Sequence, residues 1–350
     1  MRRRRFGPRP TGGLSRARGH SMDRAAKGPS KECILRIAVM GSGGVGGYFG
    51  ARLVKGGADV HFVARGAHLA AMRDHGLAVE GGPEAIHLPK VNVTDDPKTI
   101  GPVDLVMFCV KLWDTEEAAR QLLPIMKPET GIISFQNGVQ KDDMLRPVFG
   151  DKALMGGVAY VGTNIGRPGV IAQTGPLQRL VFGEYDGRQS PRVEAFYEAC
   201  KRGGINAEIS DDVRRSIWEK YVVLVAMSGA TTAMRQTIGP IRANPLTREF
   251  LLDLAREVVA VGRAHGVRLP ADYAEQRIPF FDDWPPEMTT SMHHDLQGGR
   301  PLEVRWLSGG VVDLGREVGV PTPMNRAVRD ILILHAGGRE AKPAPAVPAS

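Results

Sequence analysis

The stretch that decides the fold is RIAVMGSGGVGGYFGARLVKGGADVHFVARGAHL, residues 36–69. A short apolar run, RIAVM, leads into a glycine-rich turn, the segment GVGGYFGARLVKGG has helical character, and DVHFVA has the composition of a second strand. A strand, a glycine turn, a helix and a strand in this order are typical of a βαβ unit that binds a dinucleotide. The segment therefore predicts a parallel sheet with a phosphate-binding turn after its first strand.

The turn itself fits the pattern G-x-G-x-x-G. Its six residues, which we predict to contact the cofactor, are Gly41, Ser42, Gly43, Gly44, Val45 and Gly46. Glycine at position 41 permits a tight turn, at position 43 it lets the backbone approach a pyrophosphate, and at position 46 it allows close packing of helix on strand. The N–H groups at the start of the helix then face the phosphates.

The second strand ends in Arg65, where NAD-binding units usually carry an acidic residue for the ribose hydroxyls. No acidic residue stands beside it in the sequence. An arginine here can pair with a 2′-phosphate through charge-assisted hydrogen bonds. We therefore predict NADPH as the cofactor, the alternative being a solvated arginine in a loop.

Strand and helix patterns continue to alternate as far as residue 210. They are AHLAAMRDHG, VDLVMFCV, DTEEAARQLL, GIISF, VQKDDMLRPVF, then GVIAQTGPLQRLVFGE (169–184) as antiparallel edge strands, RVEAFYEACKRGG as a helix and INAEIS as a closing strand. Such alternation is typical of the α/β class with a doubly wound parallel sheet. We predict a Rossmann-type domain over residues 34–210 and an all-helical C-terminal domain over residues 211–337.

Two of these strands end in polar residues. Lys111 follows the strand VDLVMFCV, and Asn137 follows the strand GIISF. Open α/β sheets bind ligands at the carboxyl ends of their strands, so both side chains can orient a nicotinamide ribose or an anionic substrate. The alternative is that each residue only caps the next helix.

The charge of the chain is concentrated at its beginning. The formal net charge is +8, and residues 1–33 hold ten basic and two acidic residues, which accounts for the whole excess. The remaining chain is neutral, and we expect neither nucleic acid nor a membrane as its partner. We interpret residues 1–33 as a disordered basic tail, with a start at Met22, a nucleic-acid-binding arm and a transit peptide as alternatives. Residues 338–350 have the composition of a second disordered tail.

Cysteine content and hydropathy indicate the compartment. The chain has three scattered cysteines, Cys33, Cys109 and Cys200, too few for a disulfide framework. The longest apolar run, YVVLVAM at 221–227, is far shorter than a membrane span and predicts a buried helix. We expect a cytoplasmic protein.

The helical half contains a lysine on an apolar helix face. Lys220 shares its face with Ile217 and Leu224, three residues before and four after it. An ammonium group on such a surface has its pKa lowered toward neutrality, where it can donate a proton. The alternative is a side chain that extends past the apolar face to solvent. His293, His294 and Asp295 do not predict a metal site, because adjacent helical residues point in different directions.

Taken in order, the motifs resemble those of one known family. They are G-S-G-G-V-G, R-G-A-H-L, C-V-K, Q-N-G, I-W-E-K, T-S-M-H-H-D and P-L-E-V, and together they cover about residues 35–335. The set is similar to that of the ketopantoate reductase (2-dehydropantoate 2-reductase) family. The resemblance implies NADPH-dependent reduction of 2-dehydropantoate to D-pantoate on the route to pantothenate. A homodimer is one option for its assembly.

The resemblance also implies roles for individual residues. Lys220 of I-W-E-K matches the catalytic lysine that protonates the nascent alkoxide, and Glu303 of P-L-E-V matches the acid that hydrogen-bonds the substrate. Ser291 and Asn137 match substrate contacts, and Asn137 also lies near the nicotinamide. Cofactor contacts match the three glycines of the turn, Arg65 and Lys111.

The chain departs from the family pattern around the substrate. Leu224 and Ser228 stand where asparagines often follow the catalytic lysine, and Met288 replaces a polar residue. We keep Ser228 among the substrate-binding candidates. Lost amide contacts predict a more apolar pocket. The first alternative is therefore a related reductase of another 2-oxo or β-oxo acid, and the second is an NADP(H)-binding sensor without turnover.

Overall fold

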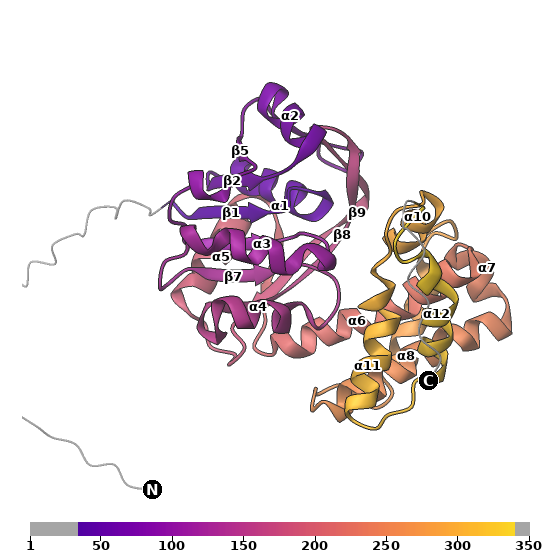
Figure 1. Ribbon diagram of the computed structural model, residues 1–350. Helices are drawn as coiled ribbons and strands as arrows, with labels where there is room; N and C mark the ends of the chain where they lie inside the picture. The colour runs from indigo at the N-terminus through magenta and orange to yellow at the C-terminus, as the bar shows by residue number, and fades with distance from the viewer. Residues whose placement is uncertain (1–33, 340–350) are drawn as a thin grey trace, which may run out of the picture. The chain divides into compact units, whose positions relative to one another are not determined.

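The structure is a computed structural model that describes residues 34–339. The predictions for residues 1–33 and for all but the first two residues of the segment 338–350 fall outside this range. Residues 34–339 contain ten strands (Figure 1). They are β1 (Arg36–Met40), β2 (Asp59–Val63), β3 (Leu77–Glu80), β4 (Ile86–Leu88), β5 (Asn92–Thr94), β6 (Leu105–Phe108), β7 (Gly131–Ser134), β8 (Leu154–Arg167), β9 (Val170–Gly183) and β10 (Asn206–Ile209).

All ten strands belong to one sheet. Along it the order is β4-β3-β9-β8-β7-β6-β1-β2-β5, and β10 pairs with β9. The strands from β8 through β7, β6, β1 and β2 to β5 are parallel, which places their carboxyl ends along one edge. The glycine turn follows β1 near the middle of this order. The predicted Rossmann-type parallel sheet is confirmed.

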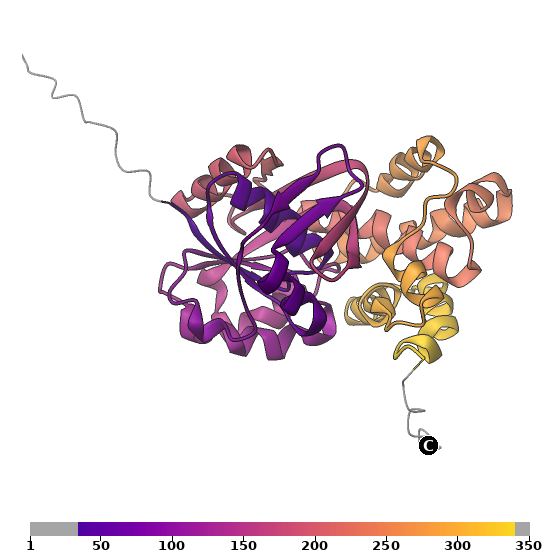
Figure 2. The same ribbon diagram turned by 90° about the horizontal axis from the view of Figure 1, so that it is seen from above.

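Helices cover both faces of the sheet (Figure 2), and alternate residues of β1 are buried against opposite sets of helices. Ile37 and Val39 are buried in a core with α1 (Gly44–Lys55) and α5 (Pro191–Arg202). Ala38 and Met40 are buried in a second core with α3 (Thr115–Leu122) and α4 (Lys141–Phe149). Side chains of a strand point to opposite faces in turn, so a strand buried on both faces is apolar throughout. This is why RIAVM has no polar alternation after its first residue.

Two details differ from the sequence-based expectation. The short strands β3, β4 and β5 and the long strand β8 were not predicted. In addition, the stretch 169–184 was expected to form antiparallel edge strands, but it is one strand, β9, that pairs antiparallel with β8 and lies inside the sheet. Its two halves are covered by parallel pairing with β3 and with β10.

From residue 211 to 339 the described chain is helical, as predicted. Its helices are α6 (Val213–Met234), α7 (Ile238–Ala243), α8 (Pro245–Ala264), α9 (Tyr273–Arg277), α10 (Ser291–Gln297), α11 (Ser308–Glu317) and α12 (Pro323–Leu332). The remaining α-helix, α2 (Gly66–His75), follows β2 in the first part of the described chain. Pro245 is the first residue of α8, where its fixed φ and missing N–H are tolerated. No helix within residues 34–339 is long and apolar enough to cross a membrane.

Helix α6 connects the helical part to the sheet. Near its start, Val213 and Ile217 are buried against Val158 of β8 and Val181 of β9. Its second half belongs to the apolar core of the helical part, together with α8, α11 and α12. A residue in the middle of α6 therefore lies where the two parts meet, and Lys220 is such a residue.

Candidate active site

The glycine turn has the geometry that its sequence predicts. Gly41 has a φ of 95°, and a Cβ at this position would lie 2.7 Å from the backbone nitrogen of Val110. A Cβ on Gly46 would collide with the carbonyl oxygen of Gly41, so this glycine allows α1 to start close to the strand. A Cβ on Gly43 would meet nothing within 4 Å, which leaves open space over the turn where a ligand can approach the backbone.

The other residues of the turn fix its position. Ser42 is buried and its hydroxyl donates to the carbonyl oxygen of Val63, 2.9 Å away. A Cβ on Gly44 would lie 2.5 Å from the carbonyl oxygen of Thr163, so the turn also packs closely on β8. Val45 lies in the first turn of α1, whose N-terminus has no side-chain cap. The first N–H groups of this helix are therefore available to an anion.

Arg65 stands just before α2 and has a partner that the sequence did not predict. Its guanidinium is 82% exposed and donates to the Asp114 carboxylate at 2.7 Å. Asp114 belongs to the short helix η2 (Leu112–Asp114), which follows Lys111 after β6. The sequence has no acidic residue next to Arg65, but in the folded chain the Asp114 carboxylate lies beside it, so that premise of the cofactor prediction is wrong. A 2′-phosphate at this position would have to compete with Asp114 for the guanidinium.

Lys220 reaches the carboxyl end of β7. Its ammonium donates to the Oδ1 atom of Asn137 at 3.0 Å and lies 5.9 Å from the centre of the Tyr160 ring. Burial and, to a smaller extent, the Lys141 ammonium lower the pKa of Lys220 from 10.5 to about 8, against the opposing effect of the Glu303 carboxylate. An ammonium group of this kind can give up its proton near neutral pH.

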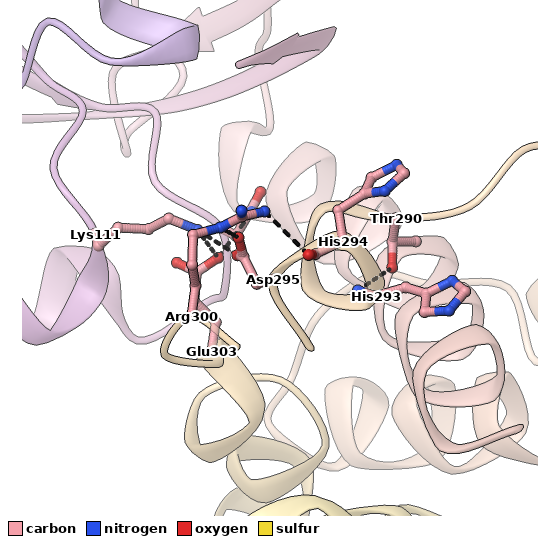
Figure 3. A network of polar contacts seen from close by, with 8 residues as sticks. Lys111, Thr290, His293, His294, Asp295, Arg300 and Glu303 are labelled. Carbon is pink, nitrogen blue, oxygen red and sulfur yellow. Dashed lines mark hydrogen bonds and ion pairs between the residues drawn. The ribbon is translucent and has the colours of Figure 1, made fainter. Parts of the chain in front are cut away.

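Glu303 joins the lysine and amide to a second lysine. It is 4% exposed, at the start of the short helix η6 (Glu303–Arg305), and its Oε2 atom accepts from Asn137 Nδ2 at 3.4 Å and from Lys111 Nζ at 3.3 Å. Lys111 also donates to Asp295 at 3.3 Å, and Figure 3 shows its side chain extended toward both carboxylates. Burial would lower the pKa of Lys111, but Glu303 and Asp295 raise it above its ordinary value. Lys111 is therefore a fixed positive charge at this point.

The structure brings four of the predicted residues together and leaves others apart. Lys220, Asn137, Glu303 and Lys111 form one chain of contacts between the strand ends and the helical part. Ser291, the first residue of α10, is exposed and has no hydrogen bond to these four in the described part of the chain.

The positions that depart from the family pattern lie on α6 and in the loop before α10. Ser228 lies two turns beyond Lys220 on α6, is 1% exposed, and its hydroxyl has no hydrogen-bond partner among residues 34–339. Leu224, one turn from Lys220, is half-buried, and Met288 is exposed. The apolar character predicted beside Lys220 is therefore supplied by Leu224.

Three charged residues near the site were missed. Lys141 and Asp142 are buried neighbours at the start of α4, and Asp295 is the second partner of Lys111. Lys141 directly follows Q-N-G-V-Q, but no local pattern marks a buried lysine at a helix start. Its burial depends on the strands packed around it.

The described residues hold no group of three or more histidine, cysteine or acidic side chains placed to bind a metal ion. His293 Nδ1 contacts the hydroxyl of Thr289 at 2.5 Å, and its ring is stacked on that of His294 with centroids 6.3 Å apart. Figure 3 shows both imidazoles beside Thr290, away from Lys111 and Glu303.

Comparison with known proteins gives a consistent result along the chain. The family described as "Ketopantoate reductase PanE/ApbA" matches residues 37–187, and "Ketopantoate reductase PanE/ApbA C terminal" matches residues 212–336. A 2-dehydropantoate 2-reductase of Archaeoglobus fulgidus is 32% identical over 301 residues, covering 85% of this chain and 97% of that protein. One of Mesorhizobium japonicum is 31% identical over 316 residues, covering 84% and 95%. A crystal structure of 2-dehydropantoate 2-reductase from Geobacter metallireducens is similar with a TM-score of 0.80, 29% identity and coverage of 85% and 99%.

Proposed function

The chain belongs to the ketopantoate reductase family of oxidoreductases, and on that premise we propose that it reduces 2-dehydropantoate to D-pantoate with NADPH, in pantothenate biosynthesis. The observation that supports this most is the contact chain from Lys220 through Asn137 to Glu303. It brings an ammonium, an amide and a carboxylate together in one small region at the strand ends. These groups can interact with the ketone oxygen and the hydroxyl of a hydroxylated 2-oxo acid.

The residues present fit a nicotinamide dinucleotide. Open space over Gly43, the tight turn at Gly41 and the uncapped start of α1 suit a pyrophosphate. Arg65 supplies the positive charge that favours NADPH over NADH, although Asp114 already contacts it. When bound, the reduced cofactor supplies the hydride for the ketone carbon.

Lys220 then acts on the ketone oxygen. With a pKa of about 8 it is mostly protonated at neutral pH, so it stabilises the developing negative charge and delivers a proton to the oxygen. Asn137 orients its ammonium through the 3.0 Å hydrogen bond. Glu303 offers a carboxylate oxygen to the substrate's hydroxyl, and the Lys111 ammonium donates to the same carboxylate at 3.3 Å.

The test is NADPH oxidation by the purified protein with 2-dehydropantoate. We expect a fall in absorbance at the nicotinamide band that depends on both the oxo acid and the enzyme, and formation of D-pantoate. NADH in place of NADPH should give a lower kcat/KM. Tight NADPH binding without oxidation by any oxo acid would instead support a sensor that binds the cofactor without turnover.

Another oxo acid is the alternative substrate, because Leu224, Ser228 and Met288 depart from the family pattern. The apolar Leu224 next to Lys220 favours an oxo acid with a larger apolar substituent than that of 2-dehydropantoate. A panel of 2-oxo and β-oxo acids of graded size separates the two substrates by their kcat/KM values. The cytoplasmic location and a homodimer remain predictions, to be checked by cell fractionation and by light scattering.

A further inference from the structure

A second lysine lies buried beside the proposed proton donor. Lys141, the first residue of α4, is 1% exposed, and its ammonium donates to the carbonyl oxygen of Ser134 and, at 2.9 Å, to that of Gly157. The carboxylate of Asp142 lies 3.3 Å away. A buried charge is retained only where it is paired and hydrogen-bonded, and these contacts meet that requirement.

The contacts of Lys141 fix the turn that carries Asn137. Ser134 is the last residue of β7, and Asn137 lies between it and Lys141, so the bond to the Ser134 carbonyl closes the turn. The bond to Gly157 ties the same turn to β8, which carries Tyr160 three residues later. Within the turn, the Gln136 side chain bonds to the buried Thr115 hydroxyl at 2.8 Å. Asn137 is therefore presented to Lys220 by a turn with little freedom.

Lys141 also acts on Lys220 through its charge. The charged groups that influence Lys220 are Lys141 on α4, which lowers its pKa, and Glu303 on η6, which raises it. Burial raises the pKa of Tyr160 on β8 to about 12, so this phenol is neutral at working pH. Burial lowers the pKa of Lys141 itself, and the Asp142 carboxylate, 3.3 Å away, opposes this effect. Burial also raises the pKa of the neighbouring Cys109 thiol to about 12.

We propose that Lys141 is a positioning residue: it holds the Asn137 turn in place and provides a second positive charge that makes Lys220 a better proton donor. The inference rests on the proposed function, because only a proton-donating Lys220 gives this charge a catalytic purpose. A merely structural Lys141 would stabilise α4 and the sheet without changing the titration of Lys220.

The test measures the titration of Lys220 directly. Protein labelled with [13C]lysine gives Cε resonances that follow each amine with pH, and the Lys220 resonance is the one missing from Lys220→Met. In Lys141→Met we expect the midpoint of Lys220 to rise by about half to one pH unit, as removal of one nearby like charge requires. Lys141→Arg, which keeps the charge, should move it less, and Lys201→Met on the exposed side of α5 should not move it.

A double variant and a cofactor titration distinguish loss of folding from loss of the proposed role. Because Lys141→Met leaves Asp142 without its cation, the double variant Lys141→Met/Asp142→Asn provides a version with no unpaired buried charge. NADPH fluorescence titration of each variant reports whether the cofactor domain is folded. A Lys220 midpoint that is unchanged in a folded variant overturns the inference. A midpoint that rises, in a protein that reduces no oxo acid, leaves the electrostatic role standing and removes the proposed function.

Discussion

Replacing Lys220 with methionine removes an ammonium group that the folded protein holds in an unfavourable setting. Burial, followed by Lys141, lowers the pKa of this lysine from 10.5 to about 8 in the folded protein. Between these two values the unfolded chain binds a proton at Lys220 that the folded protein has released. The free energy of unfolding of the wild type therefore rises with pH across this window, and methionine abolishes that rise.

The size of the effect follows from the two pKa values. The full difference corresponds to about 3 kcal/mol, and about 2 kcal/mol of it should be present by about pH 9.5. Below about pH 8 both states are protonated, so the difference between wild type and Lys220→Met is constant there. The Lys220 side chain is not fully enclosed, and solvent screening makes these figures upper values.

The assay is urea unfolding of both proteins at neutral pH and at about pH 9.5. Constant contributions, such as the lost hydrogen bond to Asn137, cancel when the two differences are compared. Lys201→Met reports the pH response of an exposed lysine-to-methionine change. A wild-type advantage over Lys220→Met that stays within about 0.5 kcal/mol between the two pH values would refute the lowered pKa.

Four further variants address the cofactor turn, the 2′-phosphate position and the carboxylate. Gly46→Ala should lower stability by about 1 to 3 kcal/mol and weaken NADPH binding, because the new Cβ collides with the Gly41 carbonyl; a thermal melt and titration like the wild type's would contradict this. Arg65→Ala should weaken NADPH binding about tenfold or more and leave NADH binding unchanged, whereas Asp114→Asn should tighten NADPH binding. Fluorescence titration with both cofactors measures these affinities. Equal changes in the affinities for NADPH and NADH would contradict the role of Arg65. Glu303→Gln should raise KM for the oxo acid and shift the alkaline limb of kcat/KM to lower pH, because Glu303 raises the pKa of Lys220; an unmoved limb would exclude that contribution.

Local patterns predicted most of the fold. Residues 37–40 are buried on the two faces of the sheet, Gly41 has a positive φ, and Gly46 is required by its contact with the Gly41 carbonyl, so a short window of sequence is sufficient to recognise this unit. The strands β4 and β5 have only three residues each, and β3 lies between β4 and β9, where Val79 pairs with Ile171 in a distant part of the chain. Pairing over that distance leaves no periodic signal in either strand.

The candidate site, like the fold, could be predicted only in part from local patterns. The helical face of Lys220 is visible in the sequence, whereas the role of Glu303 was indicated only by the family resemblance. The contact between Arg65 and Asp114 joins residues 49 positions apart, and that between Lys111 and Asp295 spans 184. Each of these acids is an ordinary surface residue in its local pattern. Only the meeting of strand ends with the helical part makes them partners.

The most direct measurement is chemical rescue of Lys220→Ala in the presence of NADPH and the best oxo acid of the panel. We predict a loss of about 10²- to 10⁴-fold in kcat with NADPH affinity unchanged, and partial recovery when a small primary ammonium such as ethylammonium is added. Turnover of Lys220→Ala equal to that of the wild type would contradict proton delivery by this lysine.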